Sequence, residues 1–219
     1  MPRTATVKRL TFPEGRRVLA ISDIHGNLPF LKGVLAAAHY GPDDILVLVG
    51  ALVEKGPDSL TTLRFIMELA EWNTVYGLRG NCDNLVSEFV AARGEEERFY
   101  RHYVDVWRDR CLLVQMGHAA GFETRGPEEL PALREVVRAR FGPELAFLEA
   151  MPEILLTPDY LFVHGGVADE AHLEGLDAWK CMKNDDFLSQ GHSFRRWCIV
   201  GHWPVTLYHR RVPTARPLV

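Results

Sequence analysis

ILVLVGALVEKGPDSL, residues 45–60, is the stretch on which the interpretation of this fold depends. Its apolar run ends at Gly50, and a charged segment begins at Glu54. In α/β sheets, ligands bind in the crevice beside the carboxyl ends of the strands. The residue at this strand end is Ala51, whose methyl group offers no chemistry. The question is therefore why the tip of a buried strand carries an alanine.

Strand-then-helix units surround this stretch. An apolar run from Arg17 to Asp23 precedes an amphipathic helix over Leu28 to His39, and Ile45 to Gly50 precedes a helix over Ser59 to Trp72. A third strand, Thr74 to Leu78, leads into a further helical stretch. Three such units predict parallel or mixed strands buried between helices.

The second half of the chain changes character. Residues 84–150 are rich in Glu, Arg and Ala and have helical periodicity, broken at Gly117 to Gly126 and near Gly142. We interpret them as a helical cap insertion. Strand patterns return at Tyr160 to Val163 and at Cys198 to Val200, and each is followed by a His beside a Gly.

Length and composition fit a single domain over residues 1–219, which is 47% hydrophobic and 25% charged. The net charge of -4 argues against a nucleic-acid polymer as partner. No apolar run approaches the ~18 residues needed to cross a bilayer, and no signal peptide is visible. We therefore expect a cytoplasmic protein without a membrane partner. The final segment, Arg210 to Val219, has no strong pattern.

The four cysteines lack CxxC spacing. They are Cys82, Cys111, Cys181 and Cys198. This spacing argues against a zinc ribbon or a thioredoxin-type redox pair. Free thiols in a reducing compartment are the simplest interpretation.

The candidate functional side chains lie at five predicted strand ends. These are Asp23 and His25 in SDIHGN, the Gly50-Ala51 tip, Asn81 in RGNCDN, His164 in VHGG and His202 in GHWP. Carboxylate, carboxamide oxygen and imidazole together suit Mn, Fe or Zn better than Ca or Mg. Each group alone has an ordinary explanation as a turn, a helix cap or a structural histidine. Their conjunction beside flexible glycines predicts a metal site where the loops converge.

In this order the motifs resemble those of the calcineurin-like metallophosphoesterases. The family pattern D-x-H-G, G-D-x-x-x-x-G, G-N-H-[DE], H-[GA]-G and G-H-x-P stands here as SDIHGN, GALVEKGPDS, GNCD, VHGG and GHWP, from Ser22 to Pro204. The KGPDS continuation and the MPEILLTPDYLFVHGG segment are most similar to the bacterial phosphoprotein phosphatase branch, which includes symmetrical diadenosine tetraphosphatases. The resemblance implies a four-layer α/β (α+β) fold, in which two packed mixed β-sheets are flanked by helices, with a helical cap insertion of about residues 84–150.

The resemblance also implies a binuclear centre of Mn, Fe or Zn. Asp23 and His25 would hold the first metal, while Asn81, His164 and His202 would hold the second. In the family a metal-activated water displaces the ester in line, without a covalent enzyme intermediate. The implied partner is a phosphorylated protein or nucleotide, and the oligomeric state stays open.

Basic residues near these motifs are candidates for binding substrate. Lys55 stands where the branch has an Arg, and it would bind phosphate as a point charge. Arg79 is a second candidate, with a salt bridge that fixes its loop as the alternative. Lys180 and Lys183 occupy a stretch where relatives often place another Arg, with a solvated helix face as the alternative.

Cys82 departs from the pattern, which has a His that protonates the leaving oxygen and pairs with an acidic residue aligned with Glu54. A thiol is a weak donor, and its free pKa is about 8.5. Small phosphodiesterases of the superfamily also carry GNCD, so the departure concerns mechanism more than family. Asp83 is expected to orient the loop or, preferentially, to cap the next helix. The catalytic candidates are Asp23, His25, Glu54, Asn81, Cys82 and Asp83.

Ala51 is the larger departure, because the pattern has an Asp there whose carboxylate bridges both metals. Its loss leaves two ligands for the first ion and three for the second, so we expect the first metal to be weak or lost. The alanine is an engineered substitution, a natural loss in a pseudoenzyme, or a change compensated by another carboxylate such as Glu54. The intact neighbouring motif favours engineered or recent loss.

The leading functional prediction is therefore a metal-dependent phosphatase whose activity is impaired by Ala51. The alternative is a non-catalytic module that binds a phosphorylated ligand or a protein through the same cleft. Phosphoserine, phosphothreonine, phosphotyrosine, dinucleoside polyphosphates and small phosphodiesters all remain open as substrates, because specificity depends on the cap and the loops.

Overall fold

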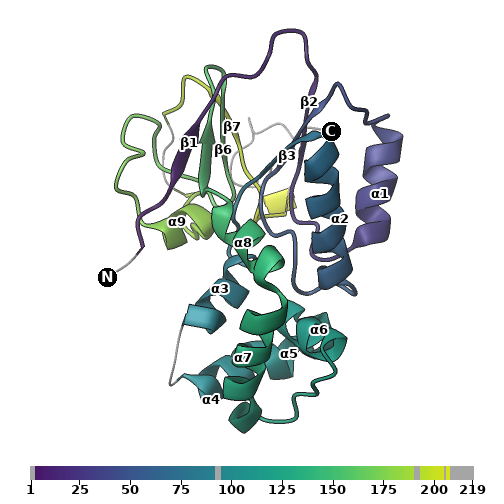
Figure 1. Cartoon of the computed structure of the whole chain (residues 1–219). Coiled ribbons are helices and arrows are strands. Elements are labelled where there is room, and N and C mark those ends of the chain that lie inside the picture. The colour runs from purple at the N-terminus through teal and green to yellow at the C-terminus, as the bar shows by residue number, and fades with distance from the viewer. Residues whose placement is uncertain (1–2, 92–94, 190–192, 205, 208–219) are drawn as a thin grey trace.

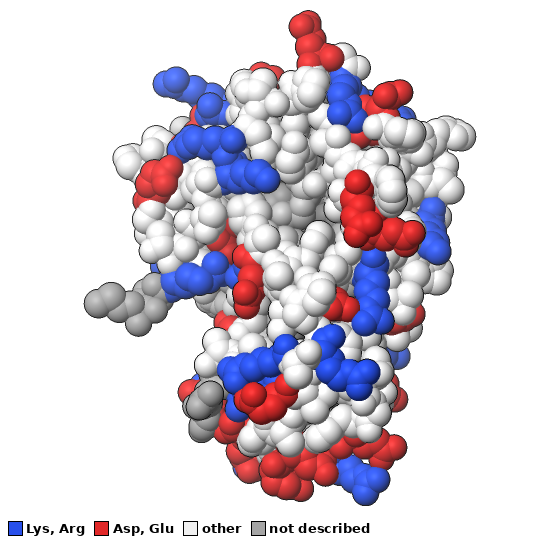
Figure 2. All heavy atoms as spheres, viewed as in Figure 1, with Lys and Arg blue, Asp and Glu red and all other residues white. Residues whose placement is uncertain are grey.

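The computed structural model describes residues 3–91, 95–189, 193–204 and 206–207. Figure 1 shows two β-sheets in the upper part of the molecule and a lobe of helices below them. Figure 2 shows basic and acidic side chains scattered together over the visible face. The final segment, Arg210 to Val219, lies outside the described residues.

One sheet has three strands in the order β2-β3-β4. The strands are β2 (Val18–Ile21), β3 (Ile45–Leu48) and β4 (Thr74–Gly77), and all of them are parallel. Every residue of β3 is fully buried, which explains its unbroken run of apolar residues. Helices α1 (Leu28–Ala37) and α2 (Ser59–Trp72) follow β2 and β3, as the sequence predicts.

The other sheet has four strands in the order β1-β5-β6-β7. They are β1 (Val7–Arg9), β5 (Ile154–Leu156), β6 (Tyr160–Val163) and β7 (Trp197–Ile199). The sheet is mixed, because β5 and β6 are antiparallel while the other pairs are parallel. Strands β1 and β5 are not evident from the sequence, since three residues are too few to display a period. The short helix α9 (Ala178–Met182) contributes to the core on this side.

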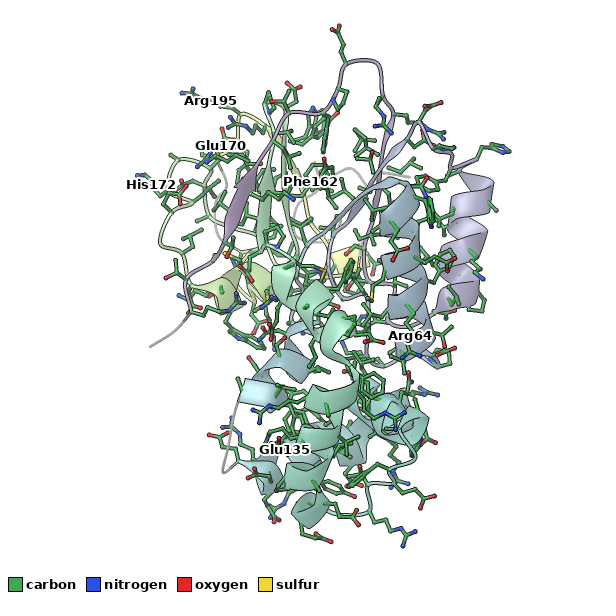
Figure 3. All side chains as sticks on the ribbon, viewed as in Figure 1. Arg64, Glu135, Phe162, Glu170, His172 and Arg195 are labelled. Carbon is green, nitrogen blue, oxygen red and sulfur yellow. The ribbon has the colours of Figure 1, made fainter. Side chains whose placement is uncertain are left out.

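The two sheets pack against each other through a shared apolar layer. Val47 of β3 lies in one buried cluster with Leu155 of β5 and Phe162 of β6. Figure 3 places Phe162 among the strands and Glu135 in the lower lobe of helices. The predicted fold of two packed sheets flanked by helices is confirmed, although one of the two sheets is entirely parallel.

The segment between β4 and β5 is helical. It contains α3 (Asn84–Ala91), α4 (Glu96–Phe99), a π-helical turn (Tyr100–Val104), α5 (Asp105–Trp107), a 3-10 turn (Arg108–Arg110), α6 (Leu112–Ala119), a second 3-10 turn (Pro127–Glu129), α7 (Leu130–Arg140) and α8 (Gly142–Ala150). Helix α6 continues through Gly117, so the expected break begins later, at Ala120. Within the described residues, no helix is both long enough and apolar enough to cross a membrane.

Candidate metal and phosphoester site

The loops after β2 and β3 run side by side at one edge of the parallel sheet. The backbone N–H of Asp23 donates to Gly50 O at 3.1 Å, and that of His25 donates to Ala51 O at 2.9 Å. Parallel neighbouring strands end at the same edge, so their loops leave the sheet together. The structure thus brings SDIHGN next to the Ala51 tip.

The backbone at these strand ends is strained. Eight non-glycine residues in the described part of the chain have a positive φ, and six belong to the predicted site. These six are Asp23, His25, Ala51, Glu54, Lys55 and His202. A left-handed conformation costs an L-residue about 1–2 kcal/mol, so surrounding contacts must hold it.

Asp83 supplies much of that restraint. One carboxylate oxygen accepts from the N–H groups of Ala51 and Gly80, both at 2.8 Å. The other accepts from Leu52 at 2.8 Å and Val53 at 3.3 Å. Burial raises the pKa of Asp83 to about 6, although these N–H groups oppose the shift. The preferred expectation, a cap for α3, is wrong: Asp83 instead orients two loops of the site.

His164 is fully buried and has its ring oriented by a single hydrogen bond. Nδ1 lies 2.7 Å from the carbonyl oxygen of Val49, which can only accept, so Nδ1 carries the proton. Burial lowers the pKa of His164 to about 4, and the ring is therefore neutral near pH 7. Nε2 then presents a lone pair, and this atom has no hydrogen-bond partner among the described residues. A Cβ atom on Gly50 or Gly80 would come within 3 Å of the ring.

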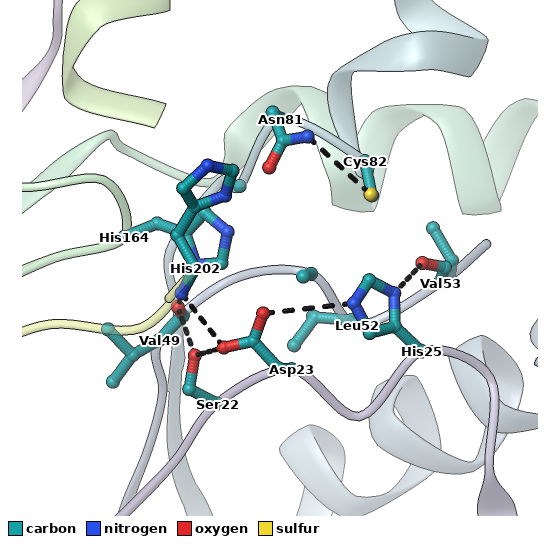
Figure 4. A network of polar contacts seen from close by, with 12 residues as sticks. Ser22, Asp23, His25, Val49, Leu52, Val53, Asn81, Cys82, His164 and His202 are labelled. Atoms are coloured by element: carbon teal, nitrogen blue, oxygen red, sulfur yellow. Dashed lines mark hydrogen bonds and ion pairs between the residues drawn. The ribbon is translucent and has the colours of Figure 1, made fainter. Parts of the chain in front are cut away.

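Asn81 and His202 lie near this histidine. The Asn81 carboxamide donates to Cys82 Sγ at 3.7 Å, while Asn81 Oδ1 is buried and, like His164 Nε2, lacks a partner in the described structure. The ring centroids of His164 and His202 are 5.3 Å apart. Figure 4 shows these side chains around one space, with Asp23 and His25 on its other sides.

Asp23 and His25 differ from this group because their side chains are partly exposed and Asp23 Oδ2 already accepts two hydrogen bonds. Asp23 Oδ2 accepts from Ser22 Oγ at 2.5 Å and from the His202 N–H at 3.0 Å. Asp23 Oδ1 lies 3.7 Å from His25 Nε2. Burial, assisted by the nearby Lys55 ammonium, lowers the pKa of His25.

Two buried donor atoms of the candidate site have no partner among the described residues. His164 Nε2 and Asn81 Oδ1 are donor types that bind borderline divalent ions, and leaving both unpaired costs desolvation energy. Ala51 places no carboxylate between the two halves. No group of three His, Cys, Asp or Glu side chains suited to a metal ion exists in the described chain. Asn81 Oδ1 and His164 Nε2 are therefore the candidate donor atoms for an ion at this position.

Cys82 and Lys55 lie on the same side of the site. Burial raises the pKa of the Cys82 thiol to about 12, even though the Lys55 ammonium opposes the shift, so the thiol stays protonated. Lys55 Nζ lies 5.9 Å from the centroid of the Trp107 ring. The helical insertion thus borders the predicted phosphate-binding lysine.

Glu54 contradicts two expectations. Both of its carboxylate oxygens lie 3.2 Å from the Leu112 N–H at the start of α6, and the residue is buried. Burial raises its pKa to about 8. Both carboxylate oxygens of Glu54 are directed to the insertion, which argues against Glu54 as a replacement for the missing carboxylate at position 51.

Arg79 is a structural residue, and its prediction as a substrate-binding group is wrong. It is buried, its Nη2 donates to Leu148 O at 2.8 Å, and its Nε lies 3.9 Å from Glu153. These contacts agree with the alternative given for Arg79, a salt bridge that fixes its loop. Lys183 remains partly exposed beside the loop of Gly165, with its ammonium 3.9 Å from Asp185.

Three residues of the site were not predicted from the sequence. Ser22 holds the Asp23 carboxylate, and its place inside SDIHGN was the available signal. Gln115 Nε2 donates to Asp109 O at 2.7 Å and to Pro57 O at 3.3 Å, which joins the insertion to the KGPDS loop. Arg110 lines a surface pocket that Asp23 also lines. No sequence signal marks the last two, because their roles depend on how the insertion folds back.

The chain belongs to the calcineurin-like phosphoesterase family, whose model matches residues 16–216. Members generally use two divalent metal ions. This membership confirms the resemblance predicted from the ordered motifs.

Individual relatives match shorter stretches. The chain is 44% identical over 64 residues to a symmetrical bis(5'-nucleosyl)-tetraphosphatase of Pectobacterium atrosepticum, covering 29% of this chain and 22% of the relative. It is 35% identical over 86 residues to serine/threonine-protein phosphatase 1 of Salmonella typhimurium, covering 39% and 38%. These matches span less than two fifths of either relative's length. A solved structure described as a putative diadenosine tetraphosphatase has a TM-score of 0.47 and 23% identity, covering 74% of this chain and 55% of that one.

Proposed function

We propose that this chain binds phosphoesters at a metal ion held by Asn81, His164 and His202, and that it hydrolyses them slowly because Ala51 replaces the bridging carboxylate. The unpaired, buried Nε2 of His164 is the observation that carries this proposal. A buried polar atom left without a partner costs about 1–3 kcal/mol. Coordination of an ion by this atom and by Asn81 Oδ1 removes that cost.

The residues around this position have distinct tasks in the proposed reaction. A bound Mn, Fe or Zn ion would polarise a phosphoryl oxygen. Lys55 and Lys183 lie beside the site and would bind phosphate oxygens as point charges. Cys82 stays protonated and is a poor proton donor to a leaving oxygen. Slow turnover follows from the weak donor and the missing carboxylate together.

We place the substrate among phosphorylated nucleotides and phosphoproteins. The family acts on phosphoesters, and the relatives named above include a nucleoside tetraphosphatase and a serine/threonine phosphatase. The choice between them depends on the surfaces around the phosphate.

Restoring the carboxylate tests the proposal directly. Ala51→Asp, assayed with p-nitrophenyl phosphate and Mn, is expected to raise kcat/KM by at least about 100-fold, the size of a lost transition-state contact. Ala51→Asn is the matched control, because it has the same shape and tolerates a positive φ but has no charge. An Asp variant no more active than the Asn variant would contradict the proposal.

The second candidate is a non-catalytic phospho-ligand-binding module. Its support is that Asp23, at the first metal position, already has hydrogen-bond partners within the chain. Binding of inorganic phosphate with equal affinity in Mn and in EDTA, together with an inactive Ala51→Asp variant, would favour this candidate. Binding that requires Mn would favour the metal-dependent enzyme.

A further inference from the structure

A hollow of about 740 Å³ lies between the SDIHGN loop, α1 and the edge of the helical insertion. We propose that it binds the aromatic ring of a small phosphoester, and that Arg110 binds a second anionic group on that ring. The inference rests on the proposed function, which places the reacting phosphate at the adjacent loops. A volume of this size suits a small molecule.

The hollow is continuous with the candidate site. Asp23, His25 and Lys55 of the candidate site line it, together with Phe30 and Val34 of α1. The organic group of a phosphoester bound near Lys55 would therefore lie in a hollow that α1 also lines.

The α1 side of the hollow is apolar and unusually exposed. Phe30 is 73% exposed and Val34 is 47% exposed. They are four residues apart on the helix, so they lie on the same face, one turn apart. Exposed aromatic rings gain free energy when another ring stacks on them. An aromatic ligand would cover the phenyl ring of Phe30.

The positive charge of Arg110 favours a ligand with a second anionic group. Its side chain is exposed, and no hydrogen bond or ion pair to it occurs within the described residues. Arg108 of the same turn is instead paired with Asp105 at 3.6 Å. An unpaired guanidinium favours a phosphate or carboxylate in bidentate geometry.

The position of Arg110 relative to the hollow is restrained. Gln115 donates to the carbonyl of Asp109, the residue before Arg110, and to the carbonyl of Pro57, which also lines the hollow. Gln115 Oε1 also accepts from Leu60 N at 2.9 Å. The turn that bears Arg110 and the loop after Lys55 are therefore joined through one side chain.

Calorimetry on the full chain with Mn present tests the apolar end. Phenylphosphonate is expected to bind at least about fivefold more tightly than methylphosphonate, since ring contacts add to the shared anion. Phe30→Ala should remove most of that preference and leave methylphosphonate binding unchanged. Trp72→Ala is the matched control, because Trp72 is 80% exposed and does not line the hollow.

Benzene-1,4-diphosphonate tests the role of Arg110. Its second phosphonate is expected to increase affinity about three- to tenfold over phenylphosphonate, and Arg110→Gln should abolish the gain. Arg108→Gln is the control from the same turn and should retain it.

The outcomes separate the two proposals. Equal affinity for phenyl- and methylphosphonate, or a preference that survives Phe30→Ala, would overturn the aromatic subsite while leaving the proposed function intact. Retention of the second-phosphonate gain in Arg110→Gln would overturn the assignment of Arg110. Absence of any phosphonate binding would overturn both the subsite and the proposed function.

Discussion

The two halves of the candidate metal site differ in how their donor atoms are satisfied. Asp23 and His25, in the first half, are 34% and 26% exposed, and the Asp23 carboxylate accepts hydrogen bonds from neighbouring residues. Asn81 and His164, in the second half, each have one buried atom without a partner in the described structure. The donor atoms of the first half are partly exposed, whereas the second half has two buried donor atoms without a partner among the described residues.

This contrast explains why the loss of one bridging carboxylate has unequal consequences. An exposed donor exchanges water or an internal hydrogen bond for a metal ion, so the net gain is small. A buried donor without a partner has already lost its hydration, and an ion restores the missing interaction. We therefore expect the absence of a carboxylate at position 51 to weaken metal binding on the Asp23 side more than on the His164 side.

The largest expected effect is on metal affinity. His164→Gln should weaken Mn or Zn binding by about 100-fold or more, since even the loss of an outer-shell partner costs 10–100-fold. His25→Gln should weaken it less than about threefold. Calorimetric titration of both variants measures the difference between the halves.

A folding control accompanies this experiment, because His164 is buried. Circular dichroism should show an intact fold, and Asn81→Ala should lower metal affinity in the same direction as His164→Gln. Equal losses in the His25 and His164 variants would show that the two halves contribute alike and would contradict the comparison.

The sequence revealed the parallel sheet and the five loops because both have local signatures. The buried strand β3 is an unbroken apolar run, and α2 begins and ends at the predicted residues. Strands β1 and β5 have three residues each and take their identity from pairing with distant segments. The breaks in the insertion depend on tertiary packing, so α6 could continue through Gly117.

Roles within the site were less predictable than the ligand types. Glu54 binds Leu112, and Arg79 binds Leu148, partners 58 and 69 residues away along the chain. Neither partner carries a motif, because each contributes only a backbone group. A charged residue inside a motif therefore has a predictable position but not a predictable partner.

The second prediction tests whether Glu54 belongs to the scaffold and not to either half of the site. Burial raises its folded-state pKa to about 8, above its ordinary value of 4.5, so the folded state binds the proton more tightly than the unfolded chain. Its stabilising contribution is complete below pH 4.5 and is lost as pH rises through 8. Between pH 6.5 and 8 the free energy of unfolding should fall by about 1–2 kcal/mol from this group.

Urea unfolding at these pH values measures the effect. Glu54→Gln should remove this part of the pH dependence, while the exposed Glu68→Gln should retain it. His164, whose pKa is lowered to about 4, changes stability mainly below pH 6.5, and it is present in both variants, so the comparison between them isolates Glu54. An unchanged pH dependence in Glu54→Gln would place the titrating group elsewhere.

The smallest expected effect concerns the backbone conformation at position 51. Ala51 has φ 52, so Ala51→Gly relieves backbone strain of about 1 kcal/mol, but it also loses a buried methyl group worth about 0.8 kcal/mol. Chain entropy adds a further opposing amount of about 0.4–1 kcal/mol. The net loss of unfolding free energy should be below about 1 kcal/mol, with Mn affinity unchanged, because Asp83 and not the residue 51 side chain holds the loop.

Ala146→Gly, in the exposed middle of α8, lacks the strain relief and should cost about 1 kcal/mol. A lower Mn affinity in Ala51→Gly would mean that the methyl group itself helps to position the second half of the site.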